Sequence, residues 1–183
     1  MQQSCFYEIE MKALISEEVY NHLRSELPRN HELLTEETTI TTRYRPHDVR
    51  LRSSSTGKYE IIIKEGDPTS LCRQETIAYL KSEEDLEKLK ASFPLIGFKP
   101  DPPWTKDKLE VRYNLNGYFY VVCVQHIKNF AYLLEVEHIS KKDDSEIHRP
   151  NLERIIRDLG CVPLDPKELN AKISEFIASN RTS

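Results

Sequence analysis

The sequence FYEIEMKA (residues 6–13) alternates between two kinds of position, and it sets the expectation for the whole fold. Glu8, Glu10 and Lys12 fall on one side of the alternation, and the residues between them are apolar. A strict repeat of two residues is typical of a β-strand, because successive side chains point to opposite faces. The stretch therefore predicts a strand with an apolar face and a charged face that carries two carboxylates and an ammonium group.

Similar segments recur and predict seven further strands, at residues 38–44, 49–52, 59–64, 72–80, 106–115, 118–125 and 131–139. Four helices are predicted at residues 16–28, 82–93, 150–159 and 166–179. Pro28 is expected to end the first helix, and Asn116-Gly117 is a strong hairpin signal between two of the strands. Short connections favour an antiparallel sheet, large enough here to close into a barrel, and hence an α+β fold.

The length of 183 residues suits one domain, with a barrel over about 5–140 and C-terminal helices over about 150–180. A net charge of −4 gives no general attraction to nucleic acid or a membrane, so an anion site would need a local cluster of cations. No apolar run approaches the roughly 20 residues of a membrane span. Four scattered cysteines without a CxxC pair argue against zinc and favour reduced thiols in a cytoplasmic protein.

The charged residues of the predicted strands share one face, while the opposite faces are apolar. A solvated sheet surface would produce the same alternation. In a closed barrel whose apolar faces are covered by helices, however, the charged faces must point into the lumen. Charges in a lumen are costly unless they are paired or engaged with a ligand. The pattern therefore suggests either an exposed scaffold or a binding tunnel.

Two Glu-x-Glu pairs, Glu8/Glu10 and Glu135/Glu137, place carboxylates roughly 6.5–7 Å apart along their strands. Clustered carboxylate oxygens suit Mg²⁺ or Mn²⁺. Arginine and lysine side chains suit a polyanion such as a triphosphate. The candidate phosphate-binding cations are Lys12, Arg50, Arg52, Lys64, Arg73, Lys106, Lys108 and Arg112. A metal and basic side chains acting on one phosphate chain are what phosphoryl transfer requires.

The ordered set of motifs resembles the CYTH superfamily, the triphosphate tunnel metalloenzymes. YEIEMK (7–12) resembles the ExExK signature, and DVRLR (48–52), YEIIIK (59–64), CRQET (72–76) and EVE (135–137) follow in the family's order. The resemblance covers about residues 6–139. It implies an eight-stranded antiparallel barrel that forms a tunnel, and hydrolysis of a triphosphate chain with Mg²⁺ or Mn²⁺ as cofactor.

The same resemblance implies roles for individual residues. Glu8, Glu10, Glu135 and Glu137 would be metal ligands, and Lys12, Arg50, Arg52, Lys64 and Arg73 would bind phosphates. Glu75 would orient the cations or the attacking water, so that Glu8, Glu10, Glu75 and Glu137 form the expected catalytic set. The chain departs from the family at Gln125, where an acidic residue is common, and at Ile62 and Ile77, where polar residues are common. The register of the strand from Lys106 to Arg112 stays open.

The leading hypothesis is a metal-dependent triphosphatase acting on a small-molecule triphosphate. A class IV-type adenylyl cyclase and an RNA 5′-triphosphatase are alternatives, and only the last would bind nucleic acid. A polyphosphate- or nucleotide-binding module without activity is the alternative outside the enzymes. The sequence leaves open which group carries the triphosphate, the choice between Mg²⁺ and Mn²⁺, and whether the protein is a monomer or a homodimer.

Overall fold

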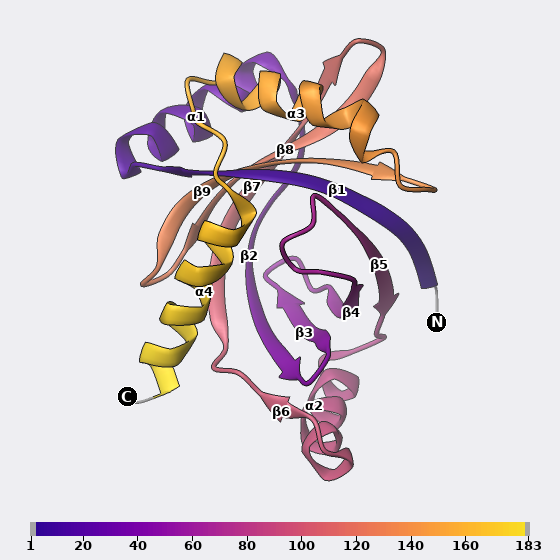
Figure 1. The fold of residues 1–183 in the computed structure, drawn as a ribbon. Coiled ribbons are helices and arrows are strands. Elements are labelled where there is room, and N and C mark those ends of the chain that lie inside the picture. Colours follow the sequence, from indigo (N-terminus) through magenta and orange to yellow (C-terminus); the bar gives the residue numbers. More distant parts are fainter. Residues whose placement is uncertain (1–2, 182–183) are drawn as a thin grey trace.

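A computed structural model describes residues 3–181 of the chain. Eight of its strands are β1 (Gln3–Ile15), β2 (Glu32–Arg45), β3 (Asp48–Ser54), β4 (Tyr59–Glu65), β5 (Cys72–Tyr79), β7 (Trp104–Leu115), β8 (Tyr118–Ile127) and β9 (Ala131–Ser140). They pair in the order β3-β4-β5-β1-β9-β8-β7-β2, and an antiparallel β2–β3 pairing closes the barrel (Figure 1). The predicted α+β fold, an eight-stranded antiparallel barrel with flanking helices, is confirmed. A two-residue strand, β6 (Lys99–Pro100), adds to the edge of β2.

Three helices cover the outside of the barrel. α1 (Glu17–Asn30) and α3 (Ser145–Asp158) lie together against the strands β1 and β7–β9, and α2 (Glu83–Ser92) packs on β3 and β4 (Figure 1). The apolar faces of the strands, such as Ile9, Leu109 and Leu134, are buried against Leu23 of α1 and Ile155 of α3. α4 (Pro166–Arg181) crosses one end of the barrel.

The charged faces consequently point inward. Side chains of all eight barrel strands line a cavity of about 570 Å³. This inward direction follows from the two-residue repeat of a β-strand. Once helices bury one face of every strand, the alternate side chains can point only into the lumen. The alternation left open whether the charged faces meet solvent or a lumen, and the fold places them in the lumen.

Two helix boundaries were predicted wrongly, and proline is the reason in both. α1 continues through Pro28 to Asn30, and the His31 N–H still bonds to the Leu27 carbonyl at 2.9 Å. α3 begins at Ser145, five residues ahead of Pro150, which lies inside it. Proline removes one backbone donor, and a helix that packs against a barrel can lose one bond without ending.

No helix within residues 3–181 is long and apolar enough to cross a membrane. All four cysteines, which lie in the described part of the chain, are free thiols.

The packing of α3 can be tested at Ile155, which is fully buried, against Ile147 of the same helix, which is 54% exposed. Ile155→Ala should lower the free energy of unfolding by about 2–5 kcal/mol, because it leaves a cavity between helix and barrel. Ile147→Ala should change it by less than about 0.5 kcal/mol. Urea unfolding followed by circular dichroism measures both, and equal losses would contradict the packing of α3 through this face.

Candidate active site

The cavity is lined by equal numbers of acidic and basic side chains. The acidic residues are Glu8, Glu10, Glu37, Asp48, Glu60, Glu75, Glu110, Glu135 and Glu137, and the basic residues are Lys12, Arg43, Arg50, Arg52, Lys58, Lys64, Arg73, Lys106 and Lys108. The formal charges of the lining cancel. What distinguishes one part of the tunnel from another is therefore how these charges are arranged.

Three acidic side chains lie close together, and they are not all neutralised by an ion pair. Carboxylate oxygens of Glu8, Glu10 and Glu137 all lie within 4.8 Å of one another. The register of two neighbouring strands causes this, because Glu10 of β1 lies directly opposite Glu137 of β9. Glu8 precedes Glu10 by two residues and so points to the same side.

The electrostatics of this cluster are those of crowded, buried acids. Burial, and then the neighbouring Glu10 carboxylate, raises the pKa of Glu8 to about 7. Burial also raises the pKa of Glu137 well above its ordinary value, with further contributions from Glu8 and Glu135. Burial acts in the same direction on Glu10, but the ammonium groups of Lys12 and Lys64 outweigh it and lower that pKa. Three hard oxygen donors that repel one another fit Mg²⁺ or Mn²⁺, whose charge would relieve the repulsion.

Glu135, the fourth predicted ligand, lines the cavity but has other partners. Its carboxylate pairs with the Lys12 ammonium at 2.9 Å and accepts a hydrogen bond from Gln125 Nε2 at 3.2 Å. Lys12 also pairs with Glu10, so it stands between Glu135 and the acidic cluster. Although burial opposes it, Lys12 keeps the pKa of Glu135 below its ordinary value. In this structure Glu135 belongs to an ion pair adjacent to the cluster.

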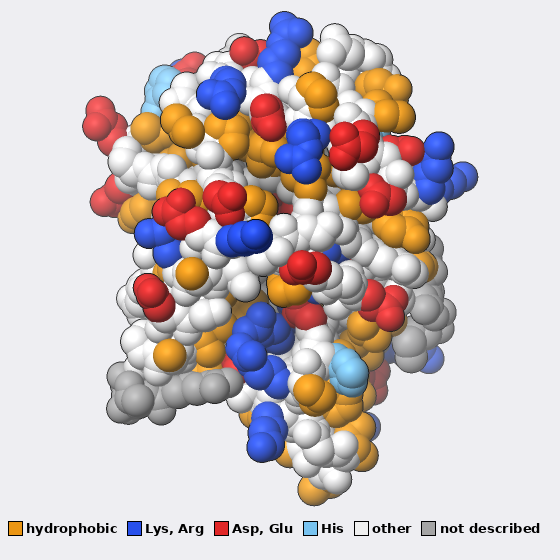
Figure 2. Space-filling model, in the orientation of Figure 1, with side chains coloured by type: hydrophobic (Ala, Val, Ile, Leu, Met, Phe, Trp, Pro, Cys, Tyr) orange, Lys and Arg blue, Asp and Glu red, His pale blue; other side chains and the backbone are white. Residues whose placement is uncertain are grey.

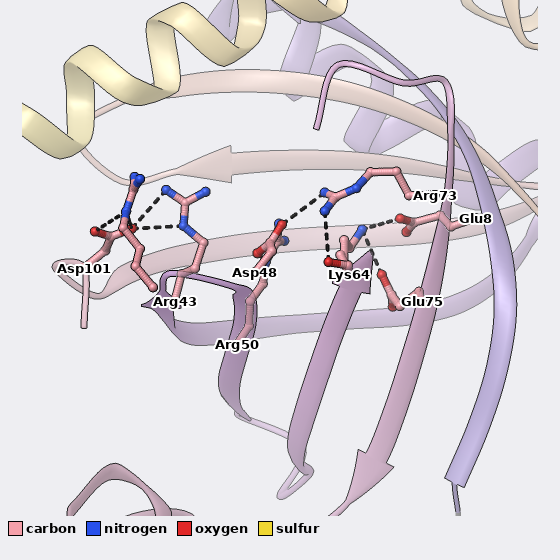
Figure 3. A network of polar contacts seen from close by, with 9 residues as sticks. Glu8, Arg43, Asp48, Arg50, Lys64, Arg73, Glu75 and Asp101 are labelled. Carbon is pink, nitrogen blue, oxygen red and sulfur yellow. Dashed lines mark hydrogen bonds and ion pairs between the residues drawn. The ribbon is translucent and has the colours of Figure 1, made fainter. Parts of the chain in front are cut away.

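Basic side chains extend from the cluster along the inside of β4 and β5. Lys64 pairs with Glu8 and, at 2.8 Å, with Glu75, which therefore fixes the position of this ammonium group (Figure 3). The guanidinium of Arg73 donates to Asp48 at 3.0 Å and to the Lys64 carbonyl at 3.2 Å. Asp48 also accepts two hydrogen bonds from Arg50, at 2.8 and 2.9 Å. One carboxylate thus orients two guanidinium groups toward the same space.

The remaining predicted cations divide into two groups. Arg52 pairs with Glu60 at 2.6 Å, and Lys108 pairs with Glu110 at 2.7 Å, all inside the cavity. Lys106 also lines the cavity, and no hydrogen bond or ion pair engages its ammonium group within residues 3–181.

Arg112 is not brought to the cavity. It has the same strand parity as Lys108 but lies past the end of the tunnel, where its guanidinium covers the Phe119 ring at 4.8 Å and pairs with Glu32 at 3.3 Å. Parity places a side chain on a face, but it does not say how far along the barrel that face stays enclosed.

Several charged residues of the site were missed from the sequence. They are Glu37, Arg43, Asp48, Glu60 and Asp101. Glu37 accepts hydrogen bonds from Ser54 and Thr56 and pairs with Lys108 at 3.1 Å, while Asp101 holds Arg43 at 2.9 Å. Asp48 and Glu60 share the parity of Arg50 and Lys64, so that signal was available. Glu37 precedes the predicted start of its strand, which β2 in fact extends to Glu32.

No protein-family model matches the chain, and neither does any curated protein. Solved structures do match. The PH1819 protein from Pyrococcus horikoshii OT3 has 18% identity and a TM-score of 0.72, covering 92% of this chain and 99% of that one. A candidate adenylate cyclase from Vibrio parahaemolyticus has 12% identity and a TM-score of 0.63, covering 85% and 90%. HpAC1, a candidate adenylyl cyclase from Hippeastrum reported to have a dominant triphosphatase activity, has 14% identity and a TM-score of 0.59, covering 87% and 90%. At these identities the likeness is one of fold.

Metal binding to the cluster should depend on pH. Glu8, with its pKa raised to about 7, holds a proton below that pH, and a divalent cation must displace it. We expect Mn²⁺ affinity to fall by about tenfold or more from pH 8 to pH 6, for one proton released. Isothermal titration calorimetry in two buffers of different ionisation enthalpy measures both affinity and proton release. Equal affinities at the two pH values would contradict a protonated cluster.

Asp48 offers a test of the basic wall. Asp48→Asn keeps the shape but removes the charge that holds Arg50 and Arg73, so we expect a loss of about 1–3 kcal/mol in unfolding free energy. Tripolyphosphate without metal should bind several-fold more weakly, because the two guanidinium groups lose the carboxylate that orients them. Asp158→Asn, at an exposed position of α3, is the control, and thermal melts with and without tripolyphosphate are the measurement. Tighter binding in Asp48→Asn would show instead that Asp48 competes with the anion for the arginines.

Proposed function

We propose that the protein hydrolyses the terminal phosphate of a triphosphate chain, with a divalent metal ion, inside the tunnel. One observation carries the proposal. Within a single cavity, three carboxylates cluster within 4.8 Å of one another, next to a wall of oriented cations. A scaffold with charged strands on its surface would not enclose these groups, and the barrel does.

Glu8, Glu10 and Glu137 would hold Mg²⁺ or Mn²⁺. The metal would supply Lewis-acid polarisation of a phosphoryl oxygen and lower the pKa of a bound water. The protein's own side chains would bind and orient the phosphate chain. Glu75 fixes the position of Lys64, and Asp48 orients the guanidinium groups. These cations neutralise the phosphate oxygens and hold the phosphate chain in line for attack.

The reaction then needs little further chemistry from the protein. Water oxygen bonds to the terminal phosphorus, the bond to the bridging oxygen breaks, and phosphate leaves from a chain shortened by one group. Negative charge moves to the bridging oxygen as that bond breaks. Cations placed along the wall, rather than at one point, can stabilise both the attacked and the leaving phosphate.

The comparisons support this proposal at the level of the fold. The Hippeastrum protein, which shares the fold, is reported to have a dominant triphosphatase activity. That protein and the one from Vibrio parahaemolyticus are also candidate cyclases, so cyclisation of ATP is the second candidate function. Cyclic AMP and pyrophosphate would be its products, against ADP and phosphate for hydrolysis.

The test is release of phosphate and of cyclic AMP from tripolyphosphate, ATP, GTP, thiamine triphosphate and 5′-triphosphate RNA, with Mg²⁺, Mn²⁺ or EDTA. We expect metal-dependent phosphate release from at least one of them. Formation of cyclic AMP instead would favour the cyclase. If neither product forms but tripolyphosphate raises the melting temperature, the protein would be a binding module.

Substitutions test the assignment of the carboxylates. Glu10→Gln and Glu137→Gln should each lower hydrolysis by at least about 100-fold, since even the partners of metal ligands contribute about 10–100-fold. The matched control is Glu65→Gln, which changes the same residue type at an exposed position of β4 outside the cavity lining. Wild-type rates in both cluster variants would remove the proposed metal site.

A further inference from the structure

The end of the cavity beneath α4 has two unlike walls. Figure 2 shows this face, where Lys and Arg side chains gather in a hollow with hydrophobic side chains beside them. The basic wall comes from β2 to β5 and contains Arg43, Arg50, Lys64 and Arg73. The other wall comes from β7 to β9 and α4, and its apolar side chains are Trp104, Ile127, Phe130, Leu133, Ile173 and Phe176.

Contacts with the barrel hold α4 across this end of the cavity. The Phe176 ring packs against Phe130 with centroids 4.9 Å apart, and Phe130 follows the end of β8. The Leu164 N–H, just ahead of α4, bonds to the carbonyl of Lys12 at 2.8 Å, beside the acidic cluster. Trp104 lies opposite Thr41 in register on the neighbouring strand, two residues from Arg43. The apolar wall therefore adjoins the basic one at β2 and β7, and both line the same cavity.

Within residues 3–181, two side chains of this wall carry a polar atom without a hydrogen-bond partner. Gln125 is 1% exposed, and its Nε2 donates to Glu135, but its Oε1 has no hydrogen-bond donor within residues 3–181. Lys106, on the neighbouring strand, lines the cavity with no hydrogen bond or ion pair in the same range. A buried acceptor without a donor is costly, so Gln125 Oε1 is suited to a bound molecule that donates a hydrogen bond, whereas the Lys106 ammonium is suited to one that accepts.

A phosphate chain matches this wall only at the Lys106 ammonium group. It offers acceptor oxygens and no apolar surface, so it satisfies neither Gln125 Oε1 nor the side chains of α4. An apolar lining with a few placed polar groups is typical of sites for organic ligands. A planar group with an N–H donor would satisfy Gln125 and pack against Ile173 and Phe176. Arg43, on the strand next to Trp104, offers a guanidinium group that can stack on such a ring.

We propose that the space between α4 and β7–β9 binds the organic group of the substrate, and that this group is a nucleobase. The inference rests on the triphosphatase function proposed above and gives its substrate class: a nucleoside triphosphate rather than inorganic tripolyphosphate. Gln125 Oε1 accepts a hydrogen bond from the base, and the apolar side chains of α4 cover its face.

The experiment compares kcat/KM for ATP, GTP, CTP and UTP with that for tripolyphosphate. We expect the best nucleotide to exceed tripolyphosphate. Phe176→Ala and Gln125→Leu should each lower kcat/KM for that nucleotide by about tenfold or more, as loss of one specific contact does. Phe176→Ala should leave tripolyphosphate within about twofold. Glu175→Ala, one residue along α4 and exposed, is the matched control and should change neither substrate.

The outcomes separate the two proposals. If tripolyphosphate is hydrolysed as well as or better than every nucleotide, the nucleobase site is overturned and the triphosphatase stands. The site is also overturned if Phe176→Ala reduces both substrates equally, because α4 would then only close the barrel. If no triphosphate is hydrolysed or bound by the wild-type chain, the function itself fails. Ile173→Ala removes less apolar surface than Phe176→Ala, so it serves for the same comparison where Phe176→Ala does not fold.

Discussion

The rest of the structure depends on one constraint: charges enclosed in a barrel must be neutralised within it. Helices α1, α2 and α3 bury the outer faces of the strands, so the alternate residues have no solvent to face. Nine acidic and nine basic side chains share the cavity, and most form ion pairs, either within one strand or between strands. The scaffold is thus a network of paired charges, and the site is where the pairing is incomplete.

That incomplete pairing occurs where β1 and β9 meet. Glu10 and Glu137 are directly opposite in the sheet, and Glu8 joins them, although like charges that face each other weaken a sheet. Burial first, and then this repulsion, raise the pKa of Glu8 and of Glu137. A proton relieves it, and a divalent cation would do the same, so the proposed metal site and this cost in stability have one origin.

Much of the fold and part of the site could be predicted from residue patterns. Alternation identified the strands and placed Glu8, Glu10, Lys64 and Arg73 on inward faces, where the structure has them. The same rule failed for Arg112, because its strand continues past the end of the cavity. It also missed Glu37, whose strand begins earlier than its β-branched residues indicate. Proline was also wrongly taken to mark helix boundaries, because packing on the barrel compensates for the one hydrogen bond that a proline removes.

The sequence by itself determined which side chains share a face, because direction alternates along any strand whatever surrounds it. Only the tertiary structure decided which of those side chains meet. The β1–β9 register brings Glu137 to Glu10 and leaves Glu135 with Lys12. Closure of the barrel through β2 and β3, and the position of α4 across one end, were equally beyond local pattern. The physical reason is that position along a barrel depends on strand pairing between segments far apart in the chain.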